Sequence, residues 1–487
     1  MESLPLLDFA VIFIYLAAVV GMGCWFARRS GTTEEFMLAG RSLSGWLVGL
    51  SVFGTYVSSI SFLANPGKSY QANWNPFVFG LSLPLGAWIA TRWFVPFYRR
   101  LGNVSAYEHL EARFGSWART YALICYLLTQ IVRMGAIMYL VALALAPLTG
   151  WDVRWIIVAT GVLVTIYTLL GGIEAVIWTD AVQSVVLTIG ILVSCGVILT
   201  GMPEGPGQLF EIAADYDKFS LGSFAFSFAE STFWVVLLYG LFINLNNFGI
   251  DQTYVQRYLT ARSERDASRS VWLGAMLFLP VSGLLFFVGT GLFAFYTAQP
   301  DLLPEGIKPD GVFPHFIVNE LPAGLTGLLI AAVFAAAMSS VDSSLNCSAT
   351  LILEDIFKRY LTPGLDERGS MRVLHISTGV LGVLGTTIAL ALVNVESVLD
   401  VWWKLAGILS GGMLGLFLLG MTSRRAGRGA AAAATVVGVA LIIWLTWLTW
   451  FEANPLHSYM TIVVGTTTIL VVGWLLAGLG SPKEPQR

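Results

Sequence analysis

The chain has 487 residues, of which 56% are hydrophobic and only 12% are charged, and its formal net charge is −3. Soluble domains carry about 25% charged residues. The low charge, a mean hydropathy of +0.74 and apolar runs of about 20 residues indicate helices that cross a bilayer. No basic patch is present, which excludes nucleic acid as a partner. The four cysteines have no CxxC spacing and the four histidines form no HExxH pattern, which excludes a disulfide framework and a zinc site.

The apolar runs predict an all-α membrane protein with about 13 transmembrane helices and no soluble domain between them. The first run lacks a basic leader and a cleavage site, so we expect it to be retained as a span. One loop begins with a capping-box pattern at Ser105–Glu108, which predicts a short amphipathic helix on the membrane surface. The expected spans lie near 6–26, 43–66, 76–98, 119–147, 154–171, 175–200, 229–250, 270–297, 323–352, 372–393, 397–421, 430–451 and 458–479.

Lysine and arginine are distributed unequally between the two sides that these spans define. With the N-terminus outside, 20 of the 27 basic residues fall in inside segments, among them Arg29, Arg119, Arg257, Lys483 and Arg487. Only four fall outside, and three fall within spans. Positive charge is enriched in cytoplasmic loops. We therefore predict a multi-pass protein of the bacterial inner (cytoplasmic) membrane, with the N-terminus outside and the C-terminus inside.

Three ionisable residues fall inside predicted spans, where such groups are costly and usually functional. Asp180 in the sixth span is either an ion ligand or a structural hydrogen-bond partner. Asp342 in the ninth span shares one helical face with Ser339 and Ser343, which favours an ion site over small-residue packing. Arg133 in the fourth span needs an anion or carbonyl groups, so structural pairing and binding of a substrate carboxylate both stay open.

Two spans contain polar interruptions that predict discontinuous helices, one near 54–66 and one near 244–249. The first combines glycine, clustered hydroxyls and a proline, and the second is rich in asparagine. Broken helices at matching places in two halves of a chain point to a transporter site. Free carbonyls, hydroxyls and carboxylates are the oxygen ligands that a hard cation such as sodium prefers.

Five stretches of the sequence together resemble the sodium:solute symporter family. Each stretch is short, and their specificity comes from their joint occurrence between the second span and the end of the ninth. They are Ser-Ser-Ile-Ser-Phe-Leu at 58–63, Tyr-Glu-His-Leu-Glu-Ala-Arg-Phe at 107–114, Gly-Gly-Ile-Glu-Ala-Val-Ile-Trp-Thr-Asp at 171–180, Asp-Gln-Thr-Tyr-Val-Gln-Arg-Tyr at 251–258, and the segment from Ala-Met-Ser-Ser to Glu-Asp at 337–355.

The resemblance implies a LeuT-like fold, in which two inverted five-helix repeats hold solute and sodium between them during alternating access. The partners would be sodium, a small organic solute and the lipid bilayer, and a monomer suffices for the mechanism. The implied segments are an additional N-terminal helix and inner loop (1–42), the first repeat (43–200), the second repeat with outer loops (201–421), and two C-terminal helices with a short tail (422–487).

The resemblance also implies the ligands of one or two sodium ions. A first site would combine the carbonyl oxygens of Gly54, Val57 and Ala336 with the hydroxyls of Ser339 and Ser340.

Some members of the family, sialic acid symporters among them, have a second sodium site. In this chain it would be formed by Asp180, Ser339, Asp342 and Ser343. A hydroxyl is expected where this chain has Asp342. The extra carboxylate either tightens sodium binding or makes the second ion a proton shared by two carboxylates.

The segment 133–140 resembles the sialic acid branch, in which the matching arginine binds the substrate carboxylate. Ile60 occupies a position where a neutral-sugar site would have a polar residue. We therefore expect import of an acidic sugar such as sialic acid. The expected substrate-binding residues are Tyr56, Ser58, Ser61, Arg133, Asn247 and Phe248.

Other functions are compatible with parts of this pattern. The substrate of a sodium symporter with these helices is alternatively a neutral sugar or a monocarboxylate. An uncoupled channel or facilitator, or a transporter-like solute sensor, is the alternative of another class, although the short tail offers no signalling domain. No nucleophile–base arrangement is found, so we expect no enzyme activity.

Overall fold

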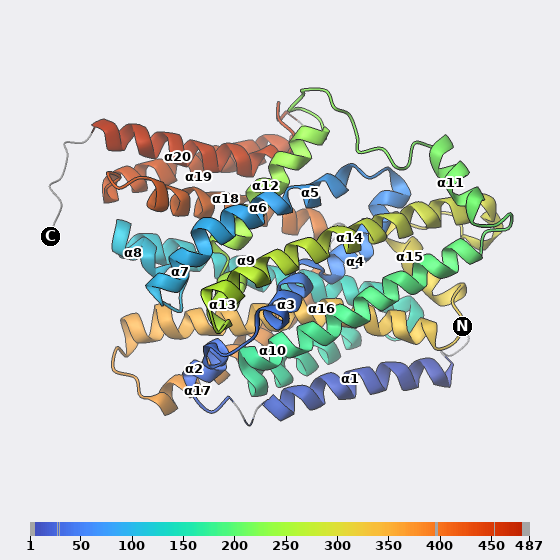
Figure 1. Ribbon diagram of the computed structural model, residues 1–487, viewed down its shortest axis with the longest axis horizontal. Coiled ribbons are helices and arrows are strands. Elements are labelled where there is room, and N and C mark those ends of the chain that lie inside the picture. The colour runs from blue at the N-terminus through green and yellow to red at the C-terminus, as the bar shows by residue number, and fades with distance from the viewer. Residues whose placement is uncertain (1–4, 27, 29, 395–397, 452, 480–487) are drawn as a thin grey trace.

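The computed structural model describes residues 5–26, 28, 30–394, 398–451 and 453–479. Within these residues, eleven helices are long and apolar enough to cross a membrane, and a bent helix pair brings the number to as many as twelve. The long helices run side by side in one bundle (Figure 1). One of the eleven helices consists of two helices joined at a kink and can be counted as one span or as two. The count of about 13 therefore stays a prediction.

The helices follow one another along the chain in two groups. Those of the N-terminal half are α1 (Leu6–Phe26), α2 (Thr33–Leu38), α3 (Gly45–Tyr56), α4 (Ser59–Gln71), α5 (Val78–Leu81), α6 (Leu83–Ile89), α7 (Val95–Leu101), α8 (Glu108–Phe114), α9 (Ser116–Thr149) and α10 (Val153–Thr200). Those of the C-terminal half are α11 (Pro206–Asp215), α12 (Phe233–Ile250), α13 (Gln252–Thr260), α14 (Glu264–Ala298), α15 (Pro309–Asn319), α16 (Leu325–Leu351), a π-helical continuation (Ile352–Leu361), α17 (Glu367–Ala391), α18 (Val398–Thr422), α19 (Arg428–Trp450) and α20 (Met460–Leu479).

The kink lies in α10, whose 48 residues would extend about 72 Å as one straight helix, far more than a bilayer core. Gly172 divides it with non-helical angles of φ 59° and ψ −161°. A Cβ atom there would lie 2.9 Å from the carbonyl oxygen of Phe36. Glycine is therefore required both by the backbone angles and by the contact. The kink separates the predicted spans 154–171 and 175–200.

The first predicted interruption is present. Helix α3 ends at Tyr56, and α4 continues at an angle of 51° to it. Val57 has non-helical angles (φ −90°, ψ 81°), and the Ser58 hydroxyl accepts a hydrogen bond from the Ser61 amide at 3.4 Å at the start of α4. The break leaves backbone groups near residues 54–58 without helical partners, as a cation site needs.

The second predicted interruption is misplaced. Helix α12 is continuous through residues 244–249, and the break lies immediately after it at Asp251. Within the asparagine-rich stretch, the polar side chain of Asn244 is satisfied by side chains of other helices, and the backbone stays helical. Asn244 accepts a hydrogen bond from the Tyr56 hydroxyl (3.2 Å) and donates one to the Ser82 hydroxyl (2.9 Å). Asp251 starts α13 by accepting a hydrogen bond from the Thr253 amide at 2.8 Å.

The predicted capping box of the short surface helix is also wrong. Helix α8 forms, but it begins at Glu108, after an uncapped Tyr107. The Ser105 hydroxyl donates instead to the Asp355 carboxylate at 2.8 Å. A tertiary contact with the buried Asp355 carboxylate thus fixes the Ser105 hydroxyl, which the local pattern had predicted to cap the start of the helix.

Helix α16 is the most enclosed span of the bundle. Every residue from Ala335 to Leu351 is buried, and α16 packs against α1, α9, α10 and α17. At the two edges of the bundle, α18, α19 and α20 pack together on one side and α1 lies on the opposite side (Figure 1). The polar face predicted for residues 339–346 therefore points only at other protein groups.

Candidate functional site

A cavity of about 600 Å³ lies between the α3–α4 break, α9, α12 and α14. Its size is within the range of about 300–1,000 Å³ that is usual for small-molecule sites. Five of the six predicted substrate-binding residues line it together, although they come from the four helices α3, α4, α9 and α12: Tyr56, Ser58, Ser61, Arg133 and Asn247.

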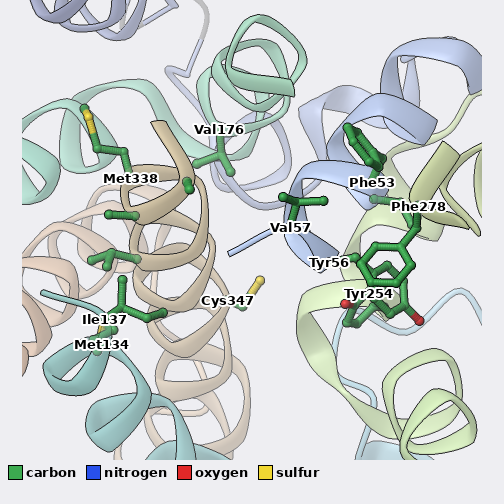
Figure 2. Packing of buried hydrophobic residues seen from close by; sticks show 14 of the residues in the cluster. Phe53, Tyr56, Val57, Met134, Ile137, Val176, Tyr254, Phe278, Met338 and Cys347 are labelled. Carbon is green, nitrogen blue, oxygen red and sulfur yellow. The ribbon is translucent and has the colours of Figure 1, made fainter. Parts of the chain in front are cut away.

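Aromatic rings form one wall of this cavity. The ring of Tyr56 lies 5.1 Å from that of Tyr254 and 5.4 Å from that of Phe278, centroid to centroid, and the three side chains group together in Figure 2. The sixth predicted residue, Phe248, is fully buried and lies outside the described lining. The centroid of its ring lies 5.7 Å from that of the Tyr56 ring, so Phe248 packs behind the aromatic wall and does not face the cavity.

The cavity contains charges of both signs. Within the described part of the chain, Arg133 forms no hydrogen bond or ion pair, so the predicted structural pairing is not found. The side chain of Asp251, which the sequence reasoning did not select, also lines the cavity and interacts electrostatically with Arg133. The donors of the Arg133 guanidinium are thus free to bind a carboxylate bidentately.

Four of the five oxygen atoms predicted for a first sodium site lie close together. The Ser339 hydroxyl is 3.4 Å from the Gly54 carbonyl oxygen and 3.3 Å from that of Ala336, and the Ser340 hydroxyl is 3.4 Å from the same Ala336 oxygen. Val57 is fully buried at the helix break. Carbonyl and hydroxyl oxygens from α3 and α16 therefore meet in a water-poor place, where a hard cation would replace weak hydrogen bonds.

Asp180 forms an ion pair that the sequence reasoning missed. Arg257, which the charge distribution assigned to an inside loop, is fully buried in α13. It donates to the Asp180 carboxylate at 2.8 Å. The Ser51 hydroxyl donates to the same Asp180 oxygen at 2.5 Å. Arg257 also donates to the hydroxyls of Ser51 (2.8 Å) and Ser343 (2.7 Å) and to the Thr253 carbonyl oxygen (2.7 Å).

Asp342 belongs to the same network. Its carboxylate accepts hydrogen bonds from the Tyr167 hydroxyl at 2.6 Å and from the Ser343 hydroxyl at 3.3 Å. Because Arg257 donates to both Asp180 and Ser343, and Ser343 donates to Asp342, the two carboxylates are joined through the Arg257 guanidinium and the Ser343 hydroxyl. The structure thus joins three of the four residues predicted for a second ion site, Asp180, Asp342 and Ser343. The fourth, Ser339, lies one turn before Ser343 and accepts a hydrogen bond from the Ser343 hydroxyl through its backbone carbonyl at 2.7 Å.

The two ends of the cavity differ. At one end its lining reaches Lys68 in the last turn of α4 and the exposed Ser458. Toward the other end of the helices, Arg119 in the first turn of α9 donates to the carboxylates of Asp355 (3.0 Å) and Glu111 (3.0 Å). Arg119 was also assigned to an inside loop, yet its side chain is buried. An ion-pair network, which we call the Arg119 cluster, therefore ties the starts of α8 and α9 to the first turn of the π-helical continuation of α16.

Comparisons with known proteins agree with this geometry. The family model of the sodium:solute symporter family matches residues 36–438. The sodium/sialic acid symporter NanT of Aliivibrio fischeri is 35% identical over 480 residues, which are 98% of this chain and 94% of that protein.

Solved structures give the same result for the fold. A sodium-coupled sialic acid symporter, in a substrate-bound outward-open state with a novel sodium site, has a TM-score of 0.91 at 34% identity, over 98% of this chain and 99% of that chain. Mhp1, a nucleobase–cation-symport-1 family transporter, has a TM-score of 0.56 at 16% identity over 91% and 93% of the two chains, which shows a shared fold alone. The predicted LeuT-like fold is confirmed, and the chain belongs to the sodium:solute symporter family.

Proposed function

We propose that this protein imports an acidic sugar such as sialic acid together with sodium by alternating access. The observation that carries the proposal is the Arg133 side chain, which lines the cavity and has no hydrogen-bond or ion-pair partner among the described residues. A guanidinium within the membrane whose donors form no hydrogen bonds is costly, even with the charge of Asp251 nearby. A substrate carboxylate would remove this cost, and the full-length relative from Aliivibrio fischeri is a sodium/sialic acid symporter.

The rest of the cavity suits a sugar acid. The hydroxyls of Ser58 and Ser61 and the amide of Asn247 offer donors and acceptors. The Tyr56, Tyr254 and Phe278 wall offers a flat apolar surface to the less polar face of a ring. Pockets of this kind combine an apolar wall with a few polar groups that fix orientation.

Sodium would bind between α3 and α16. The first ion would be held by Gly54, Val57, Ala336, Ser339 and Ser340. Because these ligands come from both sides of the helix break, the ion would hold the broken helix against α16 and favour the substrate-binding state. A second ion would be held by Asp180, Ser339, Asp342 and Ser343.

We place the protein in the bacterial inner membrane with its N-terminus outside and its C-terminus inside. In this orientation Lys68 and Ser458, at the open end of the cavity, lie outside, and the Arg119 cluster closes the inside. Residues 43–200 and 201–421 would be the two inverted repeats, flanked by the segments 1–42 and 422–487. Such an arrangement accepts solute from outside, as import requires.

The proposal is tested by uptake of radiolabelled N-acetylneuraminate into proteoliposomes with and without an inward sodium gradient. We expect saturable uptake that needs the gradient. Arg133→Gln should abolish uptake, and Arg133→Lys should weaken it strongly, because lysine cannot bind a carboxylate bidentately. Arg92→Gln is the matched control, since Arg92 belongs to the helical span Asn75–Leu101 but is exposed, and it should leave uptake unchanged.

The other outcomes are informative. Sodium-driven uptake of a monocarboxylate or neutral sugar in place of N-acetylneuraminate would refute the acidic sugar and keep symport. Sodium-independent, non-saturable flux would refute coupling. Normal uptake by Arg133→Gln would show that the guanidinium has a structural role.

A further inference from the structure

We propose that the N-terminal helix α1 completes the second cation site, with the Tyr15 hydroxyl and the Gln183 amide oxygen joining Asp180 and Asp342 as ligands of a cotransported sodium ion. The inference rests on the second ion of the proposed function, and it extends that site to a helix outside the two proposed repeats. It assigns a role in ion binding to a helix at the edge of the bundle.

The buried charges around Asp180 do not balance. Arg257 carries one positive charge, and Asp180 and Asp342 carry two negative charges when both are ionised. All three side chains are fully buried. One negative charge is left without compensation in a region where unpaired charges are costly. A single monovalent cation restores neutrality, whereas a divalent cation would leave an excess positive charge.

Polar atoms without partners gather at the same place. Within the described residues, the second carboxylate oxygen of Asp180 (Oδ1), both amide atoms of Gln183 and the Tyr15 hydroxyl are buried and form no hydrogen bond. The Tyr15 hydroxyl lies beside the Gln183 amide, outside the geometry of a formed hydrogen bond, and interacts electrostatically with Asp180 and Asp342. Buried polar groups are normally satisfied, so this cluster indicates a missing partner that accepts oxygen ligands.

The position of Tyr15 is fixed by the packing of α1. At one end of α1, the Asp8 carboxylate accepts hydrogen bonds from the backbone amides of Gly324 (2.7 Å) and Gly327 (2.6 Å) at the start of α16. Nearer the other end, Gly23 lies so close to Tyr167 that a Cβ atom would be 2.7 Å from the Tyr167 Cβ. Between these two anchors Tyr15 faces the bundle and is buried. The hydroxyl of Tyr167 donates to Asp342, so the second anchor of α1 is a residue that positions this carboxylate.

The chemistry of the cluster suits sodium. Every free atom that we assign to the ion is oxygen, from a carboxylate, an amide and a phenol, and hard cations prefer such ligands. Gln183 lies three residues after Asp180 on the same face of α10. The ion would thus be held by α10, α16 and α1 together.

The test measures sodium binding by the purified full-length protein in nanodiscs, from the sodium-induced rise in melting temperature, and sodium dependence of uptake in proteoliposomes. Tyr15→Phe and Gln183→Leu remove one oxygen ligand each. We expect the half-saturating sodium concentration to rise by about tenfold, since loss of groups around a metal costs at least this much, and the Hill coefficient for sodium to fall toward one.

Tyr296→Phe is the matched control, because Tyr296 is also a buried tyrosine whose hydroxyl has no partner among the described residues. It should leave the sodium response unchanged. A purely structural role of Tyr15 would lower the melting temperature in sodium-free choline buffer and leave the sodium concentration dependence intact, which would overturn the proposal. A wild-type protein without any sodium response contradicts the proposed function itself, whereas a wild-type response that both variants retain contradicts only the ligands from Tyr15 and Gln183.

Discussion

Replacing Arg257 with methionine should destabilise the protein far more than replacing an exposed arginine in a pair of the same length. Arg257 is fully buried and donates to Asp180, Ser51, Ser343 and the Thr253 carbonyl at 2.7–2.8 Å. In Arg257→Met the Asp180 carboxylate keeps only the Ser51 hydroxyl as a donor. Breaking a buried ion pair from one side costs about 3–5 kcal/mol, and we expect a loss in this range.

Arg262 offers the matched control. It pairs with Asp266 at 2.8 Å, the same distance as the Arg257–Asp180 pair, but its side chain is 62% exposed. Exposed pairs contribute about 0–1 kcal/mol, so Arg262→Met should change the free energy of unfolding by less than about 1 kcal/mol.

The assay is the free energy of unfolding in mixed micelles, from titration with a denaturing detergent. The double variant Arg257→Met/Asp180→Asn removes both charges and should lose less than Arg257→Met alone, because no carboxylate is left unpaired. Equal losses for Arg257→Met and Arg262→Met, or a double variant at least as unstable as Arg257→Met alone, would refute the reasoning that burial of the unpaired charge sets the cost.

Three further changes test other parts of the structure. Ser339→Ala removes a hydroxyl close to the carbonyls of Gly54 and Ala336 and should raise the sodium concentration needed for half-maximal uptake by tenfold or more; an unchanged value would contradict the first sodium site. Gly172→Ala forces a side chain into positive φ, 2.9 Å from the Phe36 carbonyl oxygen, and should cost about 1–3 kcal/mol of stability, whereas the control Gly196→Ala, with open space around it, should not destabilise. Burial lowers the pKa of His109 in α8 to about 4, so the unfolded chain binds a proton before the folded protein does, and stability should fall as the pH drops from about 6.5 to about 4. In His109→Gln the melting temperature should depend less on pH over that interval. An equally steep dependence in the variant would assign the acid sensitivity to other groups.

The membrane class and the α3–α4 break were predictable because they depend on local patterns. Apolar runs of bilayer length and a glycine–hydroxyl–proline cluster leave few alternatives within the hydrocarbon core. The break near Asn244 was misplaced because side chains of other helices satisfy Asn244, and only tertiary packing reveals this. The resemblance to the family supplied the pairing of Gly54 with Ser339, which are 285 positions apart.

The buried arginines show where charge counting fails. Arg257 and Arg119 were assigned to inside loops because they lie at or beyond the ends of apolar runs, yet both lie buried against carboxylates from distant segments, Asp180 and Asp355. One available indication was missed for Arg257. A helix that breaks at Asp251 can continue within the protein, so polar residues in the next turns need not reach water. Asp251 opens the family-like stretch 251–258, but the sequence does not place it in the cavity, because the direction of its side chain depends on the angle at the break.

The enclosure of α16 has a consequence for how the protein responds to its surroundings. From Ala335 to Leu351 this helix has no lipid-facing side, so changes in acyl-chain length or headgroup reach its serines and Asp342 only through the helices around it. Ion affinity should therefore vary little between membranes of different thickness. The neighbouring helices α10 and α17, which carry exposed apolar side chains, would absorb the mismatch by tilting, and a change of lipid would alter the rate of the conformational cycle while the strength of ion binding stays the same.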